Sequence, residues 1–356
     1  MILKETFDKS RIVGFRNKYR NADPGMLDKM IHALALLEML TSSGLDFIFK
    51  GGTSLVLLLD ETNRFSTDID IITEADQSVV EEHLNKITSS GFFTKWEIDK
   101  KRSFNSKIPK AHYDVFYLSD VAQKETTVLL DVLYCKNPYP SLESRTITSE
   151  WLITGEPLFS TKIPSIECIL GDKLTAFAPT TTGIPYGRNK DVEMIKQLFD
   201  ISLLIDRSRD YELVKQSFLS TAEKELSYRE NAFGVEAIYE DVFHTALVLA
   251  KREKNKPGPD LEGFAEMQQG IKKIDHFAAN KKFRIEEAIA AAAKDAYLLQ
   301  LFSTGSLSRF SLYSDKVEMN DWSVTNTEYN FLNRFSKTNR PAFFYWYSLL
   351  KSRNEL

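Results

Sequence analysis

Residues 49–72 constrain the fold and the chemistry of this chain more than any other stretch. They read FKGGTSLVLLLDETNRFSTDIDII. The apolar residues 47–49 predict a short strand, the glycine pair that follows predicts a turn, and the apolar residues 53–59 predict a short helix. The stretch ends in a second predicted strand, 68–72, which carries two aspartates. Each piece recurs by chance in unrelated proteins, but their occurrence in this order is specific.

The glycine pair and the helix after it predict a phosphate-binding turn. Glycine has no Cβ, so Gly51 and Gly52 let a phosphate approach the backbone closely. The helix presents unpaired N–H groups and the positive end of its dipole to an anion. The hydroxyl of Ser54 can add a donor beside Thr53. We therefore predict nucleotide binding at Gly51, Gly52, Thr53 and Ser54, against the alternative that the glycines form an ordinary turn.

The acidic strand predicts a metal site. Alternate residues of a strand share a face, so Asp68 and Asp70 project together while Ile69 points into the core. Neighbouring carboxylates repel each other unless a cation neutralises them, and oxygen ligands suit Mg²⁺. Asp131 interrupts the apolar strand 126–133, where an unpaired charge is unfavourable. We predict that Asp68, Asp70 and Asp131 bind two Mg²⁺ ions and are catalytic, against the alternative that they lie at strand ends on the surface.

Composition excludes several classes of protein. The 356 residues include 46 Lys plus Arg and 50 Asp plus Glu, so the formal net charge is −4. This near balance argues against coating of DNA by bulk electrostatics, although a local basic patch remains compatible with it. The two cysteines and five histidines lack the spacing of zinc ligands. No apolar run is long enough to span a membrane and no signal-like segment begins the chain, so we predict a cytoplasmic protein without a membrane partner.

The organisation of the chain changes near Pro164. Before it, strands are predicted over 92–98, 111–118 and 126–135; after it, the chain reads as nearly all helix. We therefore predict a catalytic domain with N-terminal helices over residues 1–160 and a helical domain over residues 161–356.

The motifs carry a resemblance to a known family. G-G-T-S followed by D-I-D resembles the first motif of the polymerase-β-type nucleotidyltransferase superfamily, and K-G-G-T-S-L…R-F-S-T-D-I-D is similar to the AbiEii/AbiGii toxin family, which the mycobacterial MenT toxins also resemble. The resemblance covers about residues 45–205. It implies an α+β fold, in which a polymerase-β-like core with a short mixed sheet precedes a large helical C-terminal region that completes the active-site cleft. It also implies a Mg²⁺-dependent enzyme that transfers NMP from an NTP and releases pyrophosphate.

Two later stretches extend the resemblance. The helical run E-C-I-L-G-D-K-L resembles the family's D-K motif, which implies that Lys173 contacts the triphosphate and takes part in catalysis. R-N-K-D resembles the family's R-x-K-D motif, which implies that Arg188, Lys190 and Asp191 line the same cleft, with Arg188 and Lys190 binding nucleotide and Asp191 catalytic. The alternatives are a surface lysine and an acid that stabilises the start of a helix. The loop 179–187 between them could close over substrate or simply connect two helices.

The acceptor is a separate question. The resemblance implies RNA, foremost the 3′ end of tRNA, where added nucleotides would block translation. Segment 95–110 supports RNA binding, because it holds six basic and two acidic residues; we predict contacts from Lys100, Lys101, Arg102, Lys107 and Lys110. A second basic cluster lies at 251–256, and both segments could equally be solvated loops. A small molecule such as an antibiotic, or a protein hydroxyl, remains an alternative acceptor.

The protein partners of this chain are predicted from the family resemblance more than from individual residues. It implies an antitoxin encoded nearby, which could bind the toxin or, as a kinase, phosphorylate Thr53 or Ser54. A protein-interaction role for the aromatic cluster 343–347 is the alternative of a different class, although such a cluster is more typical of a buried terminal helix. The role of residues 210–356 and the choice of NTP stay open.

Overall fold

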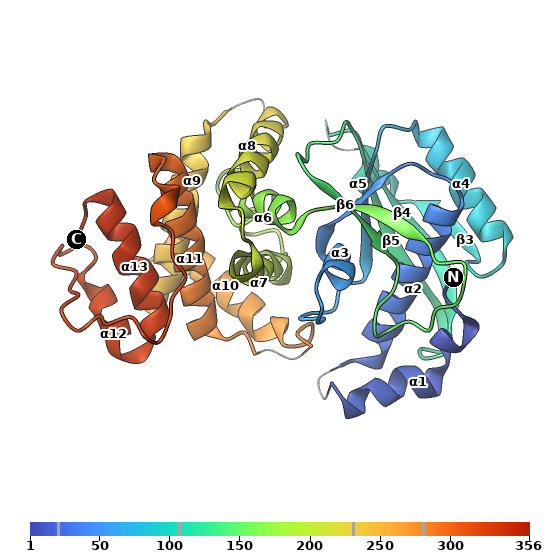
Figure 1. Ribbon diagram of the computed structural model, residues 1–356, viewed down its shortest axis with the longest axis horizontal. Coiled ribbons are helices and arrows are strands. Elements are labelled where there is room, and N and C mark those ends of the chain that lie inside the picture. The colour runs from blue at the N-terminus through green and yellow to red at the C-terminus, as the bar shows by residue number, and fades with distance from the viewer. Residues whose placement is uncertain (20–21, 105–107, 230–231, 280–281) are drawn as a thin grey trace. The chain divides into compact units, whose positions relative to one another are not determined.

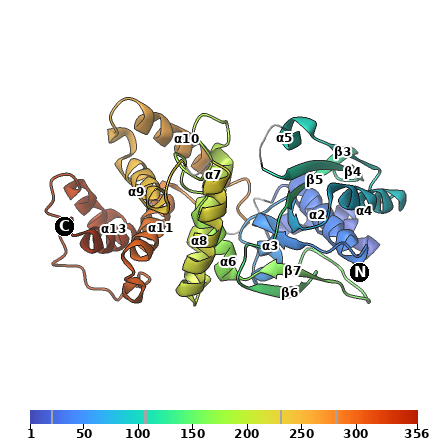
Figure 2. The ribbon, with the colours of Figure 1, turned by 90° about the horizontal axis from the view of Figure 1, so that it is seen from above.

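The computed structural model of the protein describes residues 1–19, 22–104, 108–229, 232–279 and 282–356. The chain divides into two compact units. Unit 1 comprises Met1–Ser165 with His276–Lys281, and unit 2 comprises Ile166–Asp275 with Lys282–Leu356. Figures 1 and 2 show the strands in unit 1 and the bundled helices of unit 2. The functional division at residues 160 and 161 stays a prediction.

The described residues of unit 1 form a seven-stranded mixed sheet. Its order is β3-β4-β5-β2-β1-β7-β6. β2 runs antiparallel to β1 and parallel to β5, and β4 and β5 form an antiparallel hairpin. The strands are β1 (Ile48–Lys50), β2 (Asp68–Thr73), β3 (Lys95–Ile98), β4 (Lys110–Ser119), β5 (Lys124–Tyr134), β6 (Leu142–Thr146) and β7 (Ser160–Pro164). The sheet confirms the predicted α+β fold.

One face of this sheet is covered by helices. The helix α2 (Pro24–Ser42) begins where the Asp23 carboxylate accepts a hydrogen bond from the Met26 N–H at 2.9 Å. It packs on β5, β2 and α4 (Gln77–Ser89). The other unit 1 helices are α1 (Lys9–Gly14), α3 (Gly51–Leu58) and α5 (Lys100–Phe104), with 3₁₀ turns at Lys4–Phe7 and Phe15–Asn17. The side chains of Tyr117 and Ser119 in β4 bind Asp28 of α2, so these residues lie on the face of the sheet that α2 covers. The alternate residues of β4 lie on the opposite face, which α2 does not cover.

Unit 2 is helical. The C-terminal helix α13 packs against α11, and in it Phe343 and Trp346 are fully buried, which confirms that the aromatic cluster is a docked terminal helix. The helices are α6 (Ile166–Leu174), α7 (Asp191–Arg207), α8 (Tyr211–Ser227), α9 (Val235–Lys251), α10 (Pro259–Ile274), α11 (Ile285–Thr304), α12 (Phe335–Thr338) and α13 (Arg340–Arg353), with 3₁₀ turns at Arg252–Lys254, Leu307–Arg309 and Asn330–Arg334.

Helix length and hydropathy also bear on the question of membrane insertion. Across the ranges that the structure describes, no helix combines the length and the apolar character that crossing a membrane requires.

Candidate active site

Four ionisable side chains lie in one row across four neighbouring strands of unit 1. Lys50 of β1 pairs with Asp70 of β2. Asp70 pairs with Asp131 of β5, which in turn pairs with His112 of β4. Directly paired residues of a sheet project from the same face, so the row sets two carboxylates side by side between two basic side chains.

Asp68 belongs to the same face as this row. It is separated from Asp70 by Ile69, which is fully buried, and it pairs with Leu129 of β5. Asp131 likewise alternates with buried apolar neighbours in β5. The three predicted metal ligands therefore lie on one face of two adjacent strands.

The carboxylate of Asp131 is bound by two side chains of the β4 region. His112 Nδ1 lies 2.6 Å from Asp131 Oδ1, and Arg102 Nη2 lies 3.3 Å from Asp131 Oδ2. Across the parts of the chain that the structure describes, no three His, Cys, Asp or Glu side chains are arranged to hold a metal ion. Sequence reasoning missed His112; the signal that could have found it is its position in a hairpin, where the turn sets which residue faces Asp131.

A fourth carboxylate, that of Asp114, shares this face of the sheet. Asp114 lies two residues after His112 in β4 and pairs with Leu129. Burial, and then the negative charge of Asp99, raise the pKa of the Asp114 carboxyl, and the nearby Arg102 guanidinium offsets part of this effect. The face is therefore more acidic than the sequence motifs indicate.

The glycine pair fits tightly around side chains of the same motif. Gly51 has φ of +78°, and a Cβ there would lie 2.1 Å from Asp70 Oδ2. A Cβ on Gly52 would lie 2.4 Å from Arg64 Nη2 and 2.9 Å from Ser66 Oγ. Gly51 therefore requires glycine because of its backbone and its contact with Asp70, whereas a side chain at position 52 would displace Arg64 and Ser66.

The two hydroxyls after the glycines are used inside the protein. Thr53 Oγ1 donates a hydrogen bond to the Asp68 carbonyl at 2.6 Å, and Ser54 Oγ donates to the Gly51 carbonyl at 2.8 Å. Both residues are fully buried. The Thr53 bond fixes α3 to β2, whereas the Ser54 bond lies within the first turn of α3. Phosphate binding by Thr53 and Ser54, and their phosphorylation, stay predictions.

The remaining residues predicted to bind nucleotide or to be catalytic belong to unit 2. Lys173 of α6 is buried, with Nζ 2.9 Å from Asp200 Oδ2 and 3.1 Å from Gln197 Oε1 of α7. Asp191, the first residue of α7, has Oδ2 2.7 Å from Lys273 Nζ of α10.

The segment before Asp191 is more exposed. Arg188 and Lys190 both lie on the surface of unit 2. The prediction that these residues, with Lys173 and Asp191, share a cleft with the carboxylates stays a prediction.

The loop 179–187 is tied to unit 2 at both ends. The Thr180 N–H and the Thr181 hydroxyl each donate to Asp241 Oδ2 at 2.8 Å. The Gly187 N–H donates to Glu266 Oε2 at 2.7 Å. The loop is thus connected to α9 and α10 as well as to its neighbours in sequence.

The predicted RNA-binding residues lie beside the acidic face. Three of them, Lys100, Lys101 and Arg102, form α5, and Lys110 begins β4; Lys107 lies outside the described residues. The helix α5 is joined to β4, because Ser103 Oγ accepts a hydrogen bond from the His112 backbone N–H at 2.9 Å. The residue pattern predicted only a connection between strands here, but residues 100–104 form a short basic helix that contacts Asp131 through Arg102.

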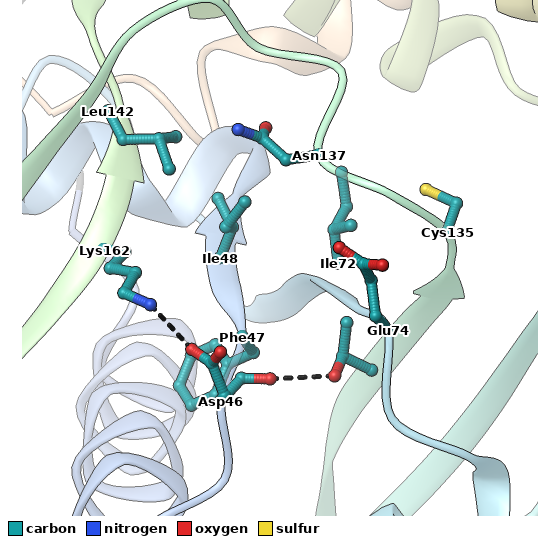
Figure 3. Close-up of a pocket in the computed structure, with 10 residues that line it drawn as sticks. Asp46, Phe47, Ile48, Ile72, Glu74, Cys135, Asn137, Leu142 and Lys162 are labelled. Atoms are coloured by element: carbon teal, nitrogen blue, oxygen red, sulfur yellow. Dashed lines mark hydrogen bonds and ion pairs between the residues drawn. The ribbon is translucent and has the colours of Figure 1, made fainter.

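A pocket of about 200 Å³ is lined in part by residues of β1 and β2 (Figure 3). Ile48 and Ile72 pair with each other and lie on the same face as Lys50 and Asp70, one step further along the strands. Figure 3 also shows Lys162 bound to Asp46, with a distance of 2.8 Å between Nζ and Oδ1. The full lining is Asp46, Phe47, Ile48, Ile72, Thr73, Glu74, Cys135, Asn137, Leu142 and Lys162.

The chain has a mixed sheet followed by a helical region, and the family comparison defines its class as a nucleotidyltransferase. Residues 35–290 match the family described as the nucleotidyl transferase AbiEii toxin of type IV toxin–antitoxin systems. The chain belongs to this family, which confirms the predicted membership. An antitoxin partner and an NTP substrate follow from that membership.

Comparison with solved structures finds distant similarity. JHP933 from Helicobacter pylori is 15% identical with a TM-score of 0.42, and the match covers 79% of this chain and 95% of that one. A protein of the same bacterium, described as a candidate nucleotidyltransferase, is 18% identical with a TM-score of 0.44, covering 80% and 96%. An antigenic nucleotidyltransferase-like protein from Paracoccidioides brasiliensis is 16% identical with a TM-score of 0.36, covering 59% and 91%. The comparison with curated proteins gives no match.

Proposed function

We propose that this toxin transfers NMP from an NTP to an RNA in a Mg²⁺-dependent reaction, with the 3′ end of tRNA as the leading acceptor, and so blocks translation in the cytoplasm. The observation that carries the proposal is the acidic face of unit 1: Asp68, Asp70 and Asp131 share it, and the basic helix α5 contacts it through Arg102. Carboxylates that can hold cations and a basic helix beside them suit a reaction between two polyanions.

In their chemical type, the donors of this face fit Mg²⁺. All three groups are carboxylates, which supply the oxygen ligands that Mg²⁺ takes, and Asp70 and Asp131 are directly paired. Gly51 leaves the space that the Asp70 carboxylate occupies, because a Cβ would overlap it. When bound, Mg²⁺ would neutralise phosphate charge and favour ionisation of the acceptor hydroxyl. Asp68, Asp70 and Asp131 would hold two such ions.

The chain's own residues would then bind and orient the reactants. Gly51, Gly52 and the start of α3 would receive phosphate oxygens. Lys173, Arg188, Lys190 and Asp191 of unit 2 are proposed to act on the triphosphate. The acceptor hydroxyl oxygen forms a bond to the α-phosphorus, the bond from that phosphorus to the bridging oxygen of the β-phosphate breaks, and pyrophosphate leaves. The hydroxyl proton passes to a carboxylate of the site, for which Asp131 is the candidate.

Replacing the paired acids tests the chemistry. Asp68→Asn and Asp70→Asn should each abolish Mg²⁺-dependent transfer of labelled NMP, because they remove ligand charge and leave shape almost unchanged. The exposed residue Asp76, just beyond the far end of β2, provides the matched control Asp76→Asn, which should retain activity. Full activity in the Asp68→Asn/Asp70→Asn double variant would refute the assignment.

The basic helix tests the acceptor. Purified protein is incubated with each labelled NTP and with deproteinised total RNA, total protein or a metabolite extract, and label is expected in RNA. Lys100→Glu/Lys101→Glu should lower transfer to RNA while leaving the NTP dissociation constant unchanged. Reversal of the exposed Lys337 and Lys351, which lie in unit 2 outside both basic clusters, is the matched control. Label in metabolites or protein instead would select the alternative acceptors.

The antitoxin is proposed to be encoded nearby. Co-expression tests whether it acts by stable binding or by modification, since a bound antitoxin would copurify with the toxin and a kinase would leave phosphate on it.

A further inference from the structure

The two oxygens of the Asp131 carboxylate are bound in different ways. Oδ1 meets a mostly buried histidine from the neighbouring strand, and Oδ2 meets a more exposed arginine from α5. We propose that His112 is a positioning residue that orients Asp131 for metal binding, whereas Arg102 is a displaceable cation that competes with the metal for Oδ2. The inference rests on the proposed function, in which Asp131 is a metal ligand.

The contact with His112 is short and built into the sheet. The Nδ1–Oδ1 distance is 2.6 Å, and the His112 side chain is 9% exposed. An ionised carboxylate can only accept, so Nδ1 must carry the proton of this bond. The backbone of His112 is also fixed. Its N–H donates a hydrogen bond to Ser103 Oγ, and the residue pairs with Asp131 where β4 and β5 are joined.

The other ring nitrogen supports this assignment. Nε2 of His112 is buried, and within the described ranges it has no hydrogen-bond partner. A ring that lacks a proton at Nε2 leaves only a lone pair unsatisfied there, whereas a buried N–H without an acceptor would be more unfavourable. The imidazole therefore has one hydrogen-bonding task, which is to hold Oδ1 of Asp131. Side chains that orient metal ligands in this way commonly set metal affinity.

The contact with Arg102 has the opposite character. Its Nη2–Oδ2 distance of 3.3 Å is long for a bond between two charged groups, and the arginine side chain is 43% exposed. Such ion pairs are weak because water and salt screen them. A dication at Oδ2 would replace the guanidinium, and the released Arg102 would then be free to meet a phosphate of the RNA beside Lys100 and Lys101.

The two side chains should therefore change metal affinity in opposite directions. Binding of Mn²⁺, used as a spectroscopic probe, is measured by electron paramagnetic resonance without nucleotide or RNA. His112→Phe fills the same space without the donor and should raise the apparent dissociation constant about 10- to 100-fold. His112→Asn keeps a donor near the Nδ1 position and should recover most of the affinity. Arg102→Gln should lower the dissociation constant about two- to fivefold.

Controls separate orientation from folding. The control is His83→Phe. His83 Nδ1 lies 2.8 Å from Ser43 Oγ, so its partner is not on the acidic face, and this variant should bind Mn²⁺ normally. Denaturant midpoints of all variants are compared with the wild type. If His112→Phe does not fold, His112→Asn and the exposed Arg102→Gln still test the proposal.

The outcomes distinguish the two proposals. If Asp131→Asn weakens Mn²⁺ binding but folded His112→Phe binds within twofold of the wild type, the positioning role is wrong and the metal site stands. If Arg102→Gln weakens binding, the competition is wrong. If Asp68→Asn, Asp70→Asn and Asp131→Asn all bind Mn²⁺ like the wild type, the metal site of the proposed function is itself wrong.

Discussion

At the scale of single residues, the glycine turn has two separate requirements. Gly51 adopts φ of +78°, which is unfavourable for a residue with a side chain, and its missing Cβ leaves room for the Asp70 carboxylate. Gly91 has a similar φ of +80°, but a Cβ there would meet nothing within 4 Å. Comparing Gly51 with Gly91 therefore separates the cost of backbone strain from the effect of displacing Asp70.

Alanine substitutions exploit this difference. Gly51→Ala and Gly91→Ala should each lower the free energy of unfolding by about 1–2 kcal/mol, because both place a Cβ at positive φ. Only Gly51→Ala should also lower transfer, by about 100-fold, since it displaces Asp70. Denaturant unfolding and labelled NMP transfer check the two effects. Equal activity in both variants would show that the close approach at Gly51 has no catalytic importance.

At the scale of elements, α6 and α7 are joined by a buried ion pair. Lys173 Nζ lies 2.9 Å from Asp200 Oδ2, and the side chains are 7% and 0% exposed. A buried charge that loses its partner is strongly destabilising. Loss of activity in a single Lys173 variant would therefore not show that Lys173 contacts the triphosphate.

A double variant separates stability from catalysis. Lys173→Met should lower the free energy of unfolding by about 3–5 kcal/mol, and Lys173→Met/Asp200→Asn should recover most of it because no buried charge remains without its counterion. If Lys173 acts on the triphosphate, the double variant keeps a kcat/KM for NTP at least about tenfold below the wild type. Recovery of activity together with stability would assign Lys173 a structural role alone.

At the scale of the whole molecule, the net charge of −4 conceals a local arrangement. Carboxylates gather on one face of the sheet in unit 1, and the basic helix α5 contacts that face through Arg102. Bound dications would reverse the local field there. Association with RNA should therefore depend on salt even though the protein as a whole is acidic.

The salt dependence of kcat/KM for RNA measures this contact. If about three phosphates are bound, kcat/KM should fall about 20-fold between 50 and 200 mM salt. Lys100→Glu/Lys101→Glu should give a shallower dependence, because fewer counterions are released. An unchanged slope in that variant would place the RNA contacts elsewhere on the protein.

Local patterns predicted much of unit 1, and long-range contacts explain what they missed. The glycine pair, the short helix and the alternation of Asp68 and Asp70 around Ile69 follow from backbone periodicity, which a few neighbouring residues determine. β6 and β7 were not predicted. β6 is partly exposed, so its alternation of polar and apolar residues is weak, and among the described strands it pairs with β7 alone.

The sequence by itself determined the family, the α+β class and the carboxylates at Asp68 and Asp70, because motif order and strand periodicity are local properties. The tertiary structure decided that Asp131 pairs with Asp70, that His112 and Arg102 bind its two oxygens, and that Lys173 pairs with Asp200. Those relations depend on strand register and helix packing. Hydrogen bonds and core burial between segments far apart in the chain set both, and no local pattern encodes them.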